Sequence, residues 1–574
     1  MKGDGELNAL LTNGQPCSGR VDGETIIVQL PEADTWHIEF ARTGYYEVNL
    51  YNEADTPALP FQVELSAPQI AASHIKILEE SNVKQYEVFE LEFAAAPPQG
   101  SHAVVDLCAE FCSDGETVAV NGFYAGNGRY KVRFLPQKAG RYTWRVSGVL
   151  SASGEEDCAP HDPACHGVVR ADGLHFRHDD GAWYMPFGTT VYALLHQKQS
   201  LVEQTMQTLS HAPFNKVRLC VFPKHFDYNN NEPELFPFER DGDGWDVDRP
   251  VETFWEHLEL RLRQLNEMGV QADLILFHPY DHWGFAKLSK EQCLIYLDYA
   301  VRRLAAFPNL WWSLANEYDL ITEFQLSWWA EFAAYLAGHD PYQHLISNHY
   351  CIVPWDYGNE HTTHCSIQDG GVQNVPKMQE KYGKPVIYDE CGYEGTVPYG
   401  WGNLSAFELV NRFWVAVTRG GYCTHGETFL SPDEILWWSK GGILKGESAL
   451  RIAFLREIAE ALGQPLDWLE QGDSGVETIP EVAPGLTVTP QRWQEICDGM
   501  KQHAGHCGDR AYLYYYARSC TALATLDLPD THRYRIEVID VWEMTRNVAL
   551  EGASGTVKIT LPGKEGIAVL ATAQ

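Results

Sequence analysis

Two glutamates each end an apolar run, where paired carboxylates could act together on one substrate. Glu317 follows Asn316 at the end of the run from Trp311, and Glu390 ends the run from Val386. Hydrolysis of a glycosidic bond needs one acid that protonates the leaving oxygen and one carboxylate at the anomeric carbon. A separation of about 5–5.5 Å gives retention through a glycosyl-enzyme, and a wider one gives inversion. The alternative to a catalytic role is a purely structural carboxylate pair, because Asn-Glu alone is a common dipeptide.

The elements that would position these glutamates alternate between strands and helices from about residue 170. Eight apolar runs are typical of strands, at residues 185–192, 214–222, 271–278, 310–317, 345–350, 361–368, 385–390 and 421–427. Helical patterns lie between and after them, at residues 253–268, 289–307, 324–338, 405–419 and 449–462. Eight alternations over about 290 residues predict a (β/α)8 TIM barrel. A doubly wound sheet would have fewer strands and usually a glycine-rich phosphate turn, which we do not find.

The active site of a (β/α)8 barrel lies at the carboxyl ends of its strands, so polar residues there are the candidates. Glu317 and Glu390 end the fourth and seventh runs, and we expect them to face each other across the barrel mouth. The other candidates for substrate binding are Asn316, Arg218, His278, Asp281, His282, Trp283, Tyr192, His349, His364, Gln368, His425 and Glu427.

Several of these candidates have structural alternatives. Arg218 could be a plain ion-pair partner at the mouth, and His349 and His364 could be core histidines. Part of the loop from His278 to Trp283 could only brace itself. Glu427 is a third carboxylate, which could bind a hydroxyl or a cationic sugar.

The regions that flank the barrel have the pattern of β domains. We predict a small β domain at residues 1–70, with strands at 25–30 and 45–50. An immunoglobulin-like β-sandwich is expected at residues 71–168, because short alternating strands there are separated by glycine-rich turns. The barrel is then assigned to residues 169–465, a connector to 466–505, and a C-terminal β-sandwich to 506–574.

The net charge of −35 argues against a nucleic-acid binder or a protein that binds anionic membranes, because both need a cationic face. No stretch approaches 18 uninterrupted apolar residues, so we expect no membrane span. The start of the sequence does not have the pattern of a signal peptide. The 14 cysteines are scattered, many within apolar runs, as buried reduced thiols are. These features together predict a cytoplasmic protein.

Two features of the sequence could indicate a metal site, and each has a simpler interpretation. Cys158, His161, Cys165 and His166 are suitable zinc ligands, but their spacing matches no common finger and their loop is rich in proline. A metal-dependent hydrolase of the amidohydrolase kind would usually carry His-x-His on the first strand, where this sequence has Thr189-Thr-Val-Tyr. We therefore predict that the chain needs no metal and no other cofactor.

The placement of the two glutamates resembles that in the clan A glycoside hydrolases, the retaining "4/7" barrels. The resemblance implies that Glu317 is the acid/base, that Glu390 is the nucleophile, and that Asn316 binds the sugar 2-hydroxyl. It also implies that Arg218 supports the nucleophile. Many members have a tryptophan at the end of strand 8 as the sugar platform, whereas this sequence has His425-Gly-Glu. Trp283 or the pair Trp437-Trp438 could replace it.

Residues 75–574 further resemble a group of bacterial proteins assigned to the glycoside hydrolases, which join an immunoglobulin-like module, an apiosidase-like barrel and a C-terminal β-sandwich. The likeness is carried by five segments, which begin at Phe277, Thr363, Lys384, Thr424 and Leu444.

These observations predict a retaining O-glycoside hydrolase that acts on imported oligosaccharides from one end. Burial near a carboxylate should keep Glu317 protonated, and Arg218 should keep Glu390 ionised. A carbohydrate-binding protein on a decayed barrel, and a lyase or metal hydrolase, are the alternatives. The expected partner is a glycoside or oligosaccharide, and a homo-oligomer is possible.

Overall fold

The structure, a computed structural model, describes residues 83–470, 479, 481–493 and 503–574, together with the backbone of six strands between residues 7 and 64. The chain divides into two compact units, Met1–Lys76 and Ile77–Gln574. The first unit contains the sheet β2-β1-β5-β6 and the hairpin β3-β4. Its strands are β1 (Leu7–Thr12), β2 (Gln15–Cys17), β3 (Gly19–Asp22), β4 (Thr25–Val28), β5 (Thr35–Phe40) and β6 (Gln62–Glu64). The strand expected at residues 45–50 lies outside the described residues.

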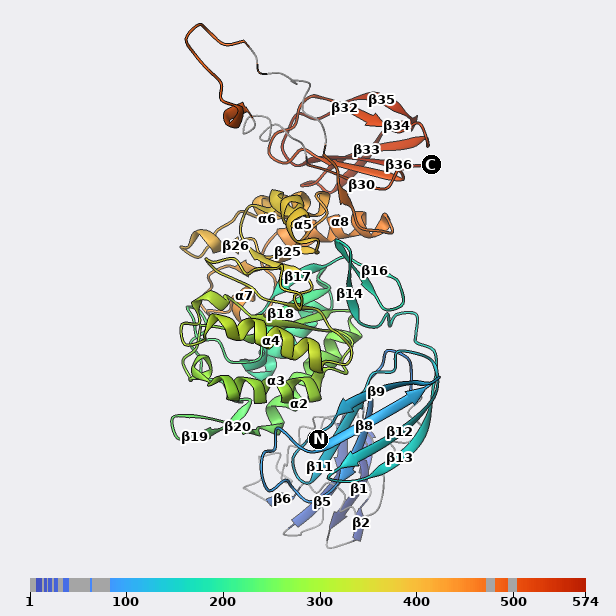
Figure 1. The fold of residues 1–574 in the computed structure, drawn as a ribbon, viewed down its shortest axis with the longest axis vertical. Coiled ribbons are helices and arrows are strands. Elements are labelled where there is room, and N and C mark those ends of the chain that lie inside the picture. The colour runs from blue at the N-terminus through green and yellow to red at the C-terminus, as the bar shows by residue number, and fades with distance from the viewer. Residues whose placement is uncertain are drawn as a thin grey trace. The chain divides into compact units, whose positions relative to one another are not determined.

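The second unit begins with a sandwich of two antiparallel sheets, drawn in blue to cyan in Figure 1. One sheet has the order β10-β11-β7 and the other β13-β12-β8-β9. The strands are β7 (Phe89–Ala94), β8 (Leu107–Ser113), β9 (Glu116–Asn121), β10 (Phe123–Tyr124), β11 (Arg129–Phe134), β12 (Gly140–Gly148) and β13 (Ala152–Cys158). Burial alternates along β8, as expected for a strand with one face on a core. Phe111 of β8 stacks on Phe134 of β11, with 4.1 Å between ring centroids.

Eight parallel strands then form the predicted barrel. They are β17 (Phe187–Thr190), β18 (Lys216–Cys220), β21 (Gln271–Phe277), β22 (Leu310–Ala315), β23 (Ile346–Ser347), β24 (Cys365–Gln368), β25 (Val386–Glu390) and β27 (Tyr422–His425). Every residue of β18 and β21 is buried, because barrel strands are covered on both faces. The fifth strand is shorter than the run at residues 345–350. The barrel closes between β23 and β24 through the Thr363 N–H, which donates to the Ile346 carbonyl at 2.8 Å, and through a bridge between His349 and Ser366.

Helices lie on the outside of the barrel, and those at residues 252–267, 290–304, 326–339, 406–418 and 448–461 follow the predicted ranges closely (Figure 1). They are α1 (Gln199–Leu209), α2 (Glu252–Glu267), α3 (Lys290–Leu304), α4 (Leu326–His339), α5 (Val375–Tyr382), α6 (Ala406–Thr418), α7 (Trp437–Lys440) and α8 (Ser448–Ala461). Ser289 starts α3 through a capping box with Gln292, and the Ser405 hydroxyl caps α6. Among the described residues, no helix is both long and apolar enough to cross a membrane.

Three small β-sheets are added to the barrel. A three-stranded sheet precedes the first barrel strand, with β14 (Val169–Asp172), β15 (His175–His178) and β16 (Trp183–Tyr184). A hairpin of β19 (Phe238–Asp241) and β20 (Gly244–Pro250) follows the second strand. A parallel pair, β26 (Glu394–Gly395) and β28 (Glu427–Thr428), joins the loops after the seventh and eighth strands.

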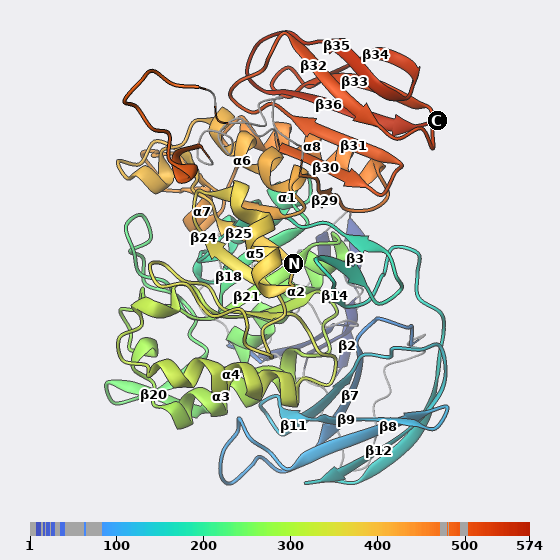
Figure 2. The same ribbon diagram turned by 45° about the horizontal axis from the view of Figure 1, so that its top comes forward.

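The C-terminal region forms two further sheets, drawn in red in Figure 2. The six-stranded sheet contains β29 (Asp467–Trp468), β30 (His503–Cys507), β31 (Ala511–Tyr515), β36 (Ile567–Ala573), β33 (Tyr534–Asp540) and β34 (Thr545–Ala553). The second sheet pairs β32 (Leu523–Leu528) with β35 (Gly555–Thr560). The sheet extends into the connector expected at residues 466–505, because β29 pairs with β30. A strand of two residues has no periodicity by which the sequence could reveal it.

A buried network of charges ties the N-terminal sandwich to the barrel helices. Arg133 of β11 forms a bidentate pair with Glu259 of α2, at 2.7 and 2.8 Å, and also bonds Glu90 at 2.6 Å. Glu259 also pairs with Arg303 of α3, which bonds Glu252 at 2.7 and 2.8 Å. Burial raises the pKa of Glu259, but the two guanidinium groups outweigh it and hold the pKa well below its usual range.

We expect Glu259→Gln to destabilise the protein by about 3–5 kcal/mol, because it leaves two buried guanidinium groups without their shared carboxylate. The matched control is Glu110→Gln, which breaks a pair with Arg145 whose side chains are 72% and 45% exposed. That control should cost less than about 1 kcal/mol. Urea denaturation followed by tryptophan fluorescence measures both, and equal losses would contradict the role of the network.

Candidate active site

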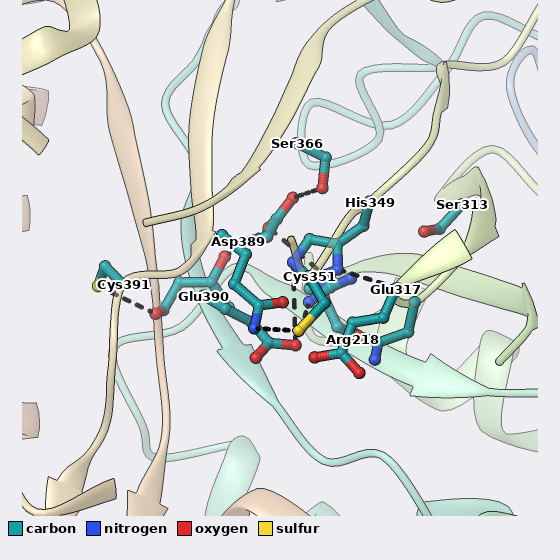
Figure 3. Close-up of polar contacts among 12 residues, drawn as sticks. Arg218, Ser313, Glu317, His349, Cys351, Ser366, Asp389, Glu390 and Cys391 are labelled. Carbon is teal, nitrogen blue, oxygen red and sulfur yellow. Dashed lines mark hydrogen bonds and ion pairs between the residues drawn. The ribbon is translucent and has the colours of Figure 1, made fainter. Parts of the chain in front are cut away.

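The two glutamates that the sequence singles out meet at the carboxyl end of the barrel. Glu317 follows β22 by two residues, after Asn316, and Glu390 is the last residue of β25. Figure 3 shows their carboxylates pointing into the same space. Glu317 is 4% exposed and has a left-handed backbone, with φ of 55° and ψ of 57°. Such a conformation is strained for a side chain with a Cβ, and strained residues are common at functional sites. Its N–H donates to His349 Nδ1 at 3.3 Å.

A tyrosine connects Glu390 to Asn316. The Tyr192 hydroxyl lies 2.9 Å from Asn316 Oδ1 and also hydrogen-bonds Glu390 Oε1. Arg218 Nη1 donates to the same hydroxyl at 3.3 Å. A phenol carries one proton, so Tyr192 donates to one of these two acceptors at a time. The Asn316 Nδ2 atom is buried without a partner among the described residues, so it is available to a ligand.

Below Glu390 lies a fully buried group of charges. Lys216 bonds Asp389 at 2.6 Å and Asp273 at 2.7 Å. Arg218 Nε lies 3.5 Å from Asp273, and its Nη1 lies 3.6 Å from Glu390 Oε1. Burial raises the pKa of Asp389, but the charges of Lys216 and Arg218 outweigh it and bring the pKa far below its usual range. Arg218 therefore stands in the middle of β18, where it serves both the interior aspartates and Glu390.

The protonation of the pair differs from what the sequence predicts. Burial, and then the charge of Glu317, raise the pKa of Glu390 to about 7, although Arg218 and Lys224 lower it. We expected Glu390 to remain ionised because of Arg218. The favourable charge of Arg218 is divided between Glu390 and the two aspartates, and the burial of Glu390 outweighs what is left. The carboxylate pair therefore holds a proton near neutral pH in the free protein.

Glu317 has its own set of partners. The Tyr280 hydroxyl donates to Glu317 Oε2. His349 lies between the carboxylates, with Nε2 3.8 Å from Glu390 Oε1, and burial lowers its pKa well below the usual value, so the ring is neutral. Cys351 is close to Glu317, and Gln368 Nε2 donates to its sulfur at 3.7 Å. Burial, and then Glu317, raise the pKa of Cys351 to about 12, so it is a thiol and not a thiolate.

The loop from His278 to Trp283 is held by hydrogen bonds to Asp281 and by contacts with the loop that follows β18. His278 is buried and its Nε2 lies 3.1 Å from the Phe222 carbonyl, and burial lowers its pKa to about 4. The Asp281 carboxylate accepts the N–H groups of Trp283, Gly284 and Ala286. His282 is exposed and stacks on His225. Trp283 donates to Glu232 at 2.8 Å and packs on Phe236. The structure thus places these four predicted binders in a loop framework.

Three further candidates, His364, His425 and Glu427, contact other parts of the protein. His364 precedes β24 and packs against Trp311 and Phe176, at the opposite end of the strands from the carboxylates. His425 Nδ1 lies 3.0 Å from the Thr189 hydroxyl, and its Nε2 lies 3.6 Å from Glu427 Oε1.

Glu427 is used to anchor a loop. Its Oε2 accepts the Lys445 N–H at 2.7 Å, while Glu394 accepts the N–H groups of Glu447 and Ser448 at the start of α8. Burial raises the pKa of Glu427, but His425 and these backbone donors bring it below the usual value. Among the described residues, no hydrogen bond or ion pair joins Glu427 to Glu317 or Glu390.

Four residues of the site were not predicted as binders, namely Tyr280, Lys224, Tyr393 and Cys351. Tyr280 belongs to the segment that carries the family resemblance, and Lys224 follows the second barrel strand by four residues. No local pattern marks them. Trp438, named above as a possible platform, does lie here, with its ring 5.9 Å from Tyr192 and 5.1 Å from Trp401. Trp437 points elsewhere and donates to Thr189 at 2.8 Å.

No group of three or more histidine, cysteine or acidic side chains in the described part of the chain is placed to hold a metal ion. Cys158, His161, Cys165 and His166 each contact other groups. The closest of these contacts is from His166 Nδ1 to Asp180, at 2.6 Å.

Comparison with known proteins identifies the domains. Residues 170–441 match the apiosidase-like catalytic domain, and residues 82–148 and 493–572 match two domains of unknown function, DUF5060 and DUF5605. A protein from Bacteroides vulgatus ATCC 8482, assigned to the glycoside hydrolases, is 34% identical, with a TM-score of 0.75 over 86% of this chain and 99% of that one. A family 5 glycoside hydrolase from the same organism shares the fold, with a TM-score of 0.55 and 15% identity over 72% of this chain and 95% of that one. No protein curated for its function matches the chain.

We expect Gly446→Ala to destabilise the protein by about 1–3 kcal/mol, because a Cβ would lie 2.4 Å from Glu394 Oε2 and 2.7 Å from Glu427 Oε1. The hydrogen bonds of both carboxylates hold them in place. Gly338→Ala, in α4 where no atom lies within 4 Å of the added Cβ, is the control and should be neutral or stabilising. Scanning calorimetry compares the two, and an unchanged Gly446→Ala variant would show that the anchored loop is loose.

We expect Glu390→Gln to raise the Tm by roughly 2–4 °C above pH 7. The pKa of Glu390 is raised from 4.5 to about 7, so its ionisation opposes folding, and this cost grows between those pH values and is constant above them. The gain should therefore vanish below about pH 4.5. Glu427→Gln is the matched control of opposite sign, because its lowered pKa stabilises the fold at neutral pH and that contribution is lost in acid. Thermal melts from pH 4 to 9 measure both variants, and a pH-independent gain would contradict the raised pKa.

Proposed function

The chain belongs to the glycoside hydrolases with an apiosidase-like catalytic domain, and we propose that it is a retaining O-glycoside hydrolase in which Glu317 is the acid/base and Glu390 the nucleophile. The observation that carries this proposal is the convergence of the two carboxylates at the ends of β22 and β25, each held by its own tyrosine. The fourth and seventh strands of a (β/α)8 barrel place such a pair on opposite sides of one sugar.

In the first step, Glu317 gives its proton to the glycosidic oxygen as the bond from that oxygen to the anomeric carbon breaks. A carboxylate oxygen of Glu390 attacks the anomeric carbon and forms the glycosyl-enzyme. In the second step, the Glu317 carboxylate takes a proton from water, whose oxygen attacks the same carbon and releases Glu390. Two inversions at that carbon give net retention.

This sequence of steps requires the shared proton to be on Glu317 when the sugar is bound. In the free protein burial favours a proton on Glu390, whose pKa is raised to about 7. We propose that the shared proton moves from Glu390 to Glu317 when the sugar is bound. Positive charge that develops at the anomeric carbon stabilises an ionised Glu390. Arg218, 3.6 Å from Glu390 Oε1, favours the same state.

The remaining contacts suggest how the sugar is held. Asn316 Nδ2 is unpartnered and buried among the described residues, which suits the bond to the 2-hydroxyl that the clan A resemblance implies. Trp438 is the best candidate for the platform under the sugar, since the end of strand 8 is used by His425 and Glu427 to anchor a loop.

We also propose that cleavage proceeds from one end of an oligosaccharide. The Tyr399 hydroxyl in the loop after β25 donates to Asp227 in the loop after β18, at 3.0 Å. Two strands, β17 and β27, lie between these in the barrel, so the joined loops obstruct one side of the mouth. The described cysteines are all free, which supports action on imported oligosaccharides in the cytoplasm.

Hydrolysis of a panel of aryl β-D- and α-L-glycosides tests the roles. Glu390→Ala should lower kcat/KM by about 10⁴-fold or more, and Glu317→Ala by about 10²–10⁴-fold. Azide should rescue Glu317→Ala and give a glycosyl azide of retained configuration, because azide needs no general base. Glu323→Ala, an exposed glutamate in the same loop as Glu317, is the control and should behave as wild type.

The assignment fails if the wild type cleaves a glycoside and both alanine variants keep that activity. An azide product of inverted configuration would instead reject the covalent intermediate.

A further inference from the structure

A lysine outside the predicted site is buried between the two tyrosines that hold the carboxylates. Lys224 is 4% exposed. Its Nζ lies 3.5 Å from the ring centroid of Tyr192 and 4.3 Å from that of Tyr280. The Trp438 ring is 5.2 Å away and the Phe226 ring 6.0 Å. The ammonium therefore rests on the faces of Tyr192 and Tyr280, whose hydroxyls bond Glu390 and Glu317.

This ammonium lacks the partners that buried lysines normally have. Among the described residues, Lys224 Nζ forms no hydrogen bond and no ion pair within 4 Å. Lys216, which is fully buried, bonds two aspartates at 2.6 and 2.7 Å. An ammonium has three N–H donors, and a buried donor without an acceptor is costly. Aromatic faces compensate the charge but leave the N–H groups without acceptors. The acceptors must therefore come from water or from a ligand.

The charges around Lys224 balance in only one protonation state of the carboxylate pair. The buried cations are Lys216, Arg218 and Lys224, and the carboxylates are Asp273, Asp389, Glu317 and Glu390. With Asp273 and Asp389 ionised and one proton on the Glu317–Glu390 pair, three positive charges meet three negative ones. Burial lowers the pKa of Lys224, while Cys220, Glu317 and Glu390 oppose that lowering. Removing the charge of Lys224 would leave the group with an uncompensated carboxylate.

We propose that Lys224 is the counter-cation of the catalytic pair and a hydrogen-bond donor to an uncharged sugar, so that the site takes a neutral glycoside and not a uronide. The sugar hydroxyls supply the acceptors that the protein does not. A sugar carboxylate would instead add a negative charge to a group that is already balanced. The part of the proposal that concerns the sugar rests on the proposed glycosidase function, whereas the counter-cation role does not.

The groups that face the pair come from every strand end packed around it. Arg218 and Lys224 belong to the second strand and its loop, and Tyr192 and Tyr280 to the loops after the first and third. His349, which is neutral, follows the fifth strand, and Asp389 and Tyr393 flank Glu390. Of these groups, Arg218 and then Lys224 lower the pKa of Glu390; Arg218 is shared with Asp273 and Asp389, whereas Lys224 forms no ion pair among the described residues.

The first test needs no substrate. In protein labelled with [δ-¹³C]glutamate, NMR should show a carboxyl carbon that titrates near pH 7 and disappears in Glu390→Gln. Lys224→Met and Lys224→Gln should both move this titration up by about one pH unit or more, because each removes the positive charge. Lys224→Arg should leave it nearly in place. If Lys224→Met does not fold, Lys224→Gln alone decides.

The matched control is Lys384→Met. Lys384 is half-buried at the start of β25 and bonds the carbonyls of Tyr357 and Asn359 at 2.6 and 2.8 Å. Its loss should lower stability without moving the titration, so a general loss of packing is separated from the loss of charge. An unchanged titration in a folded Lys224→Met or Lys224→Gln variant overturns the counter-cation role, whether or not any glycoside is hydrolysed.

The second test uses the aryl glycosides together with their matching uronides. The wild type should prefer the neutral glycoside, and Lys224→Met should lower kcat/KM on it by about 100-fold and move the acidic limb of the pH profile up by about one pH unit. Lys224→Gln keeps a hydrogen-bond donor, so its kcat/KM should fall less than that of Lys224→Met. The acidic limb of its pH profile should shift by the same amount. A wild type that prefers uronides, with a loss confined to uronides in Lys224→Met, would show instead that Lys224 is a carboxylate receptor.

Discussion

The active end of this barrel depends on the pairing of charges that have been removed from water. Asp389 is fully buried and accepts hydrogen bonds from Lys216, Ser366 and Thr424, at 2.6 to 2.8 Å. An unpaired carboxylate there would cost several kcal/mol, so these bonds hold β25 in register with its neighbours. Glu390 is the next residue, and its backbone position is therefore set by the bonds of Asp389 below it. The position of Glu390 at the barrel mouth therefore depends on hydrogen bonds in the barrel interior.

The two tyrosines extend this constraint from the interior to the reacting groups. Tyr192 and Tyr280 each hold one carboxylate through the hydroxyl and offer the ring face to Lys224. The separation of the carboxylates, their shared proton and the unpartnered N–H groups of the lysine are therefore coupled. A change in the carboxylates, their proton or the lysine should affect the other two, because a low dielectric strengthens every charge interaction among them. This arrangement suits a mechanism in which one proton must move between two glutamates.

The loops after the seventh and eighth strands anchor the backbone before α8, a role that the family pattern does not suggest. Glu427 and Glu394 converge on Gly446 and bind the backbone that leads into α8. Strand 8 therefore ends in an anchor where clan A enzymes commonly place a sugar platform. Trp438, carried by the segment just before that anchored loop, lies near Tyr192 instead.

The sequence by itself determined the eight strands, the barrel and the positions of Glu317 and Glu390, because strand and helix periodicity is local and a barrel brings all strand ends to one mouth. It did not reveal Lys224 or the anchoring role of Glu427, since loops are placed by contacts with distant segments. It also misjudged the proton of Glu390. A pKa is a balance of burial and surrounding charges, and Arg218 divides its charge among Asp273 of the third strand and Asp389 and Glu390 of the seventh. Only the tertiary structure decides that balance, because it alone sets the distances.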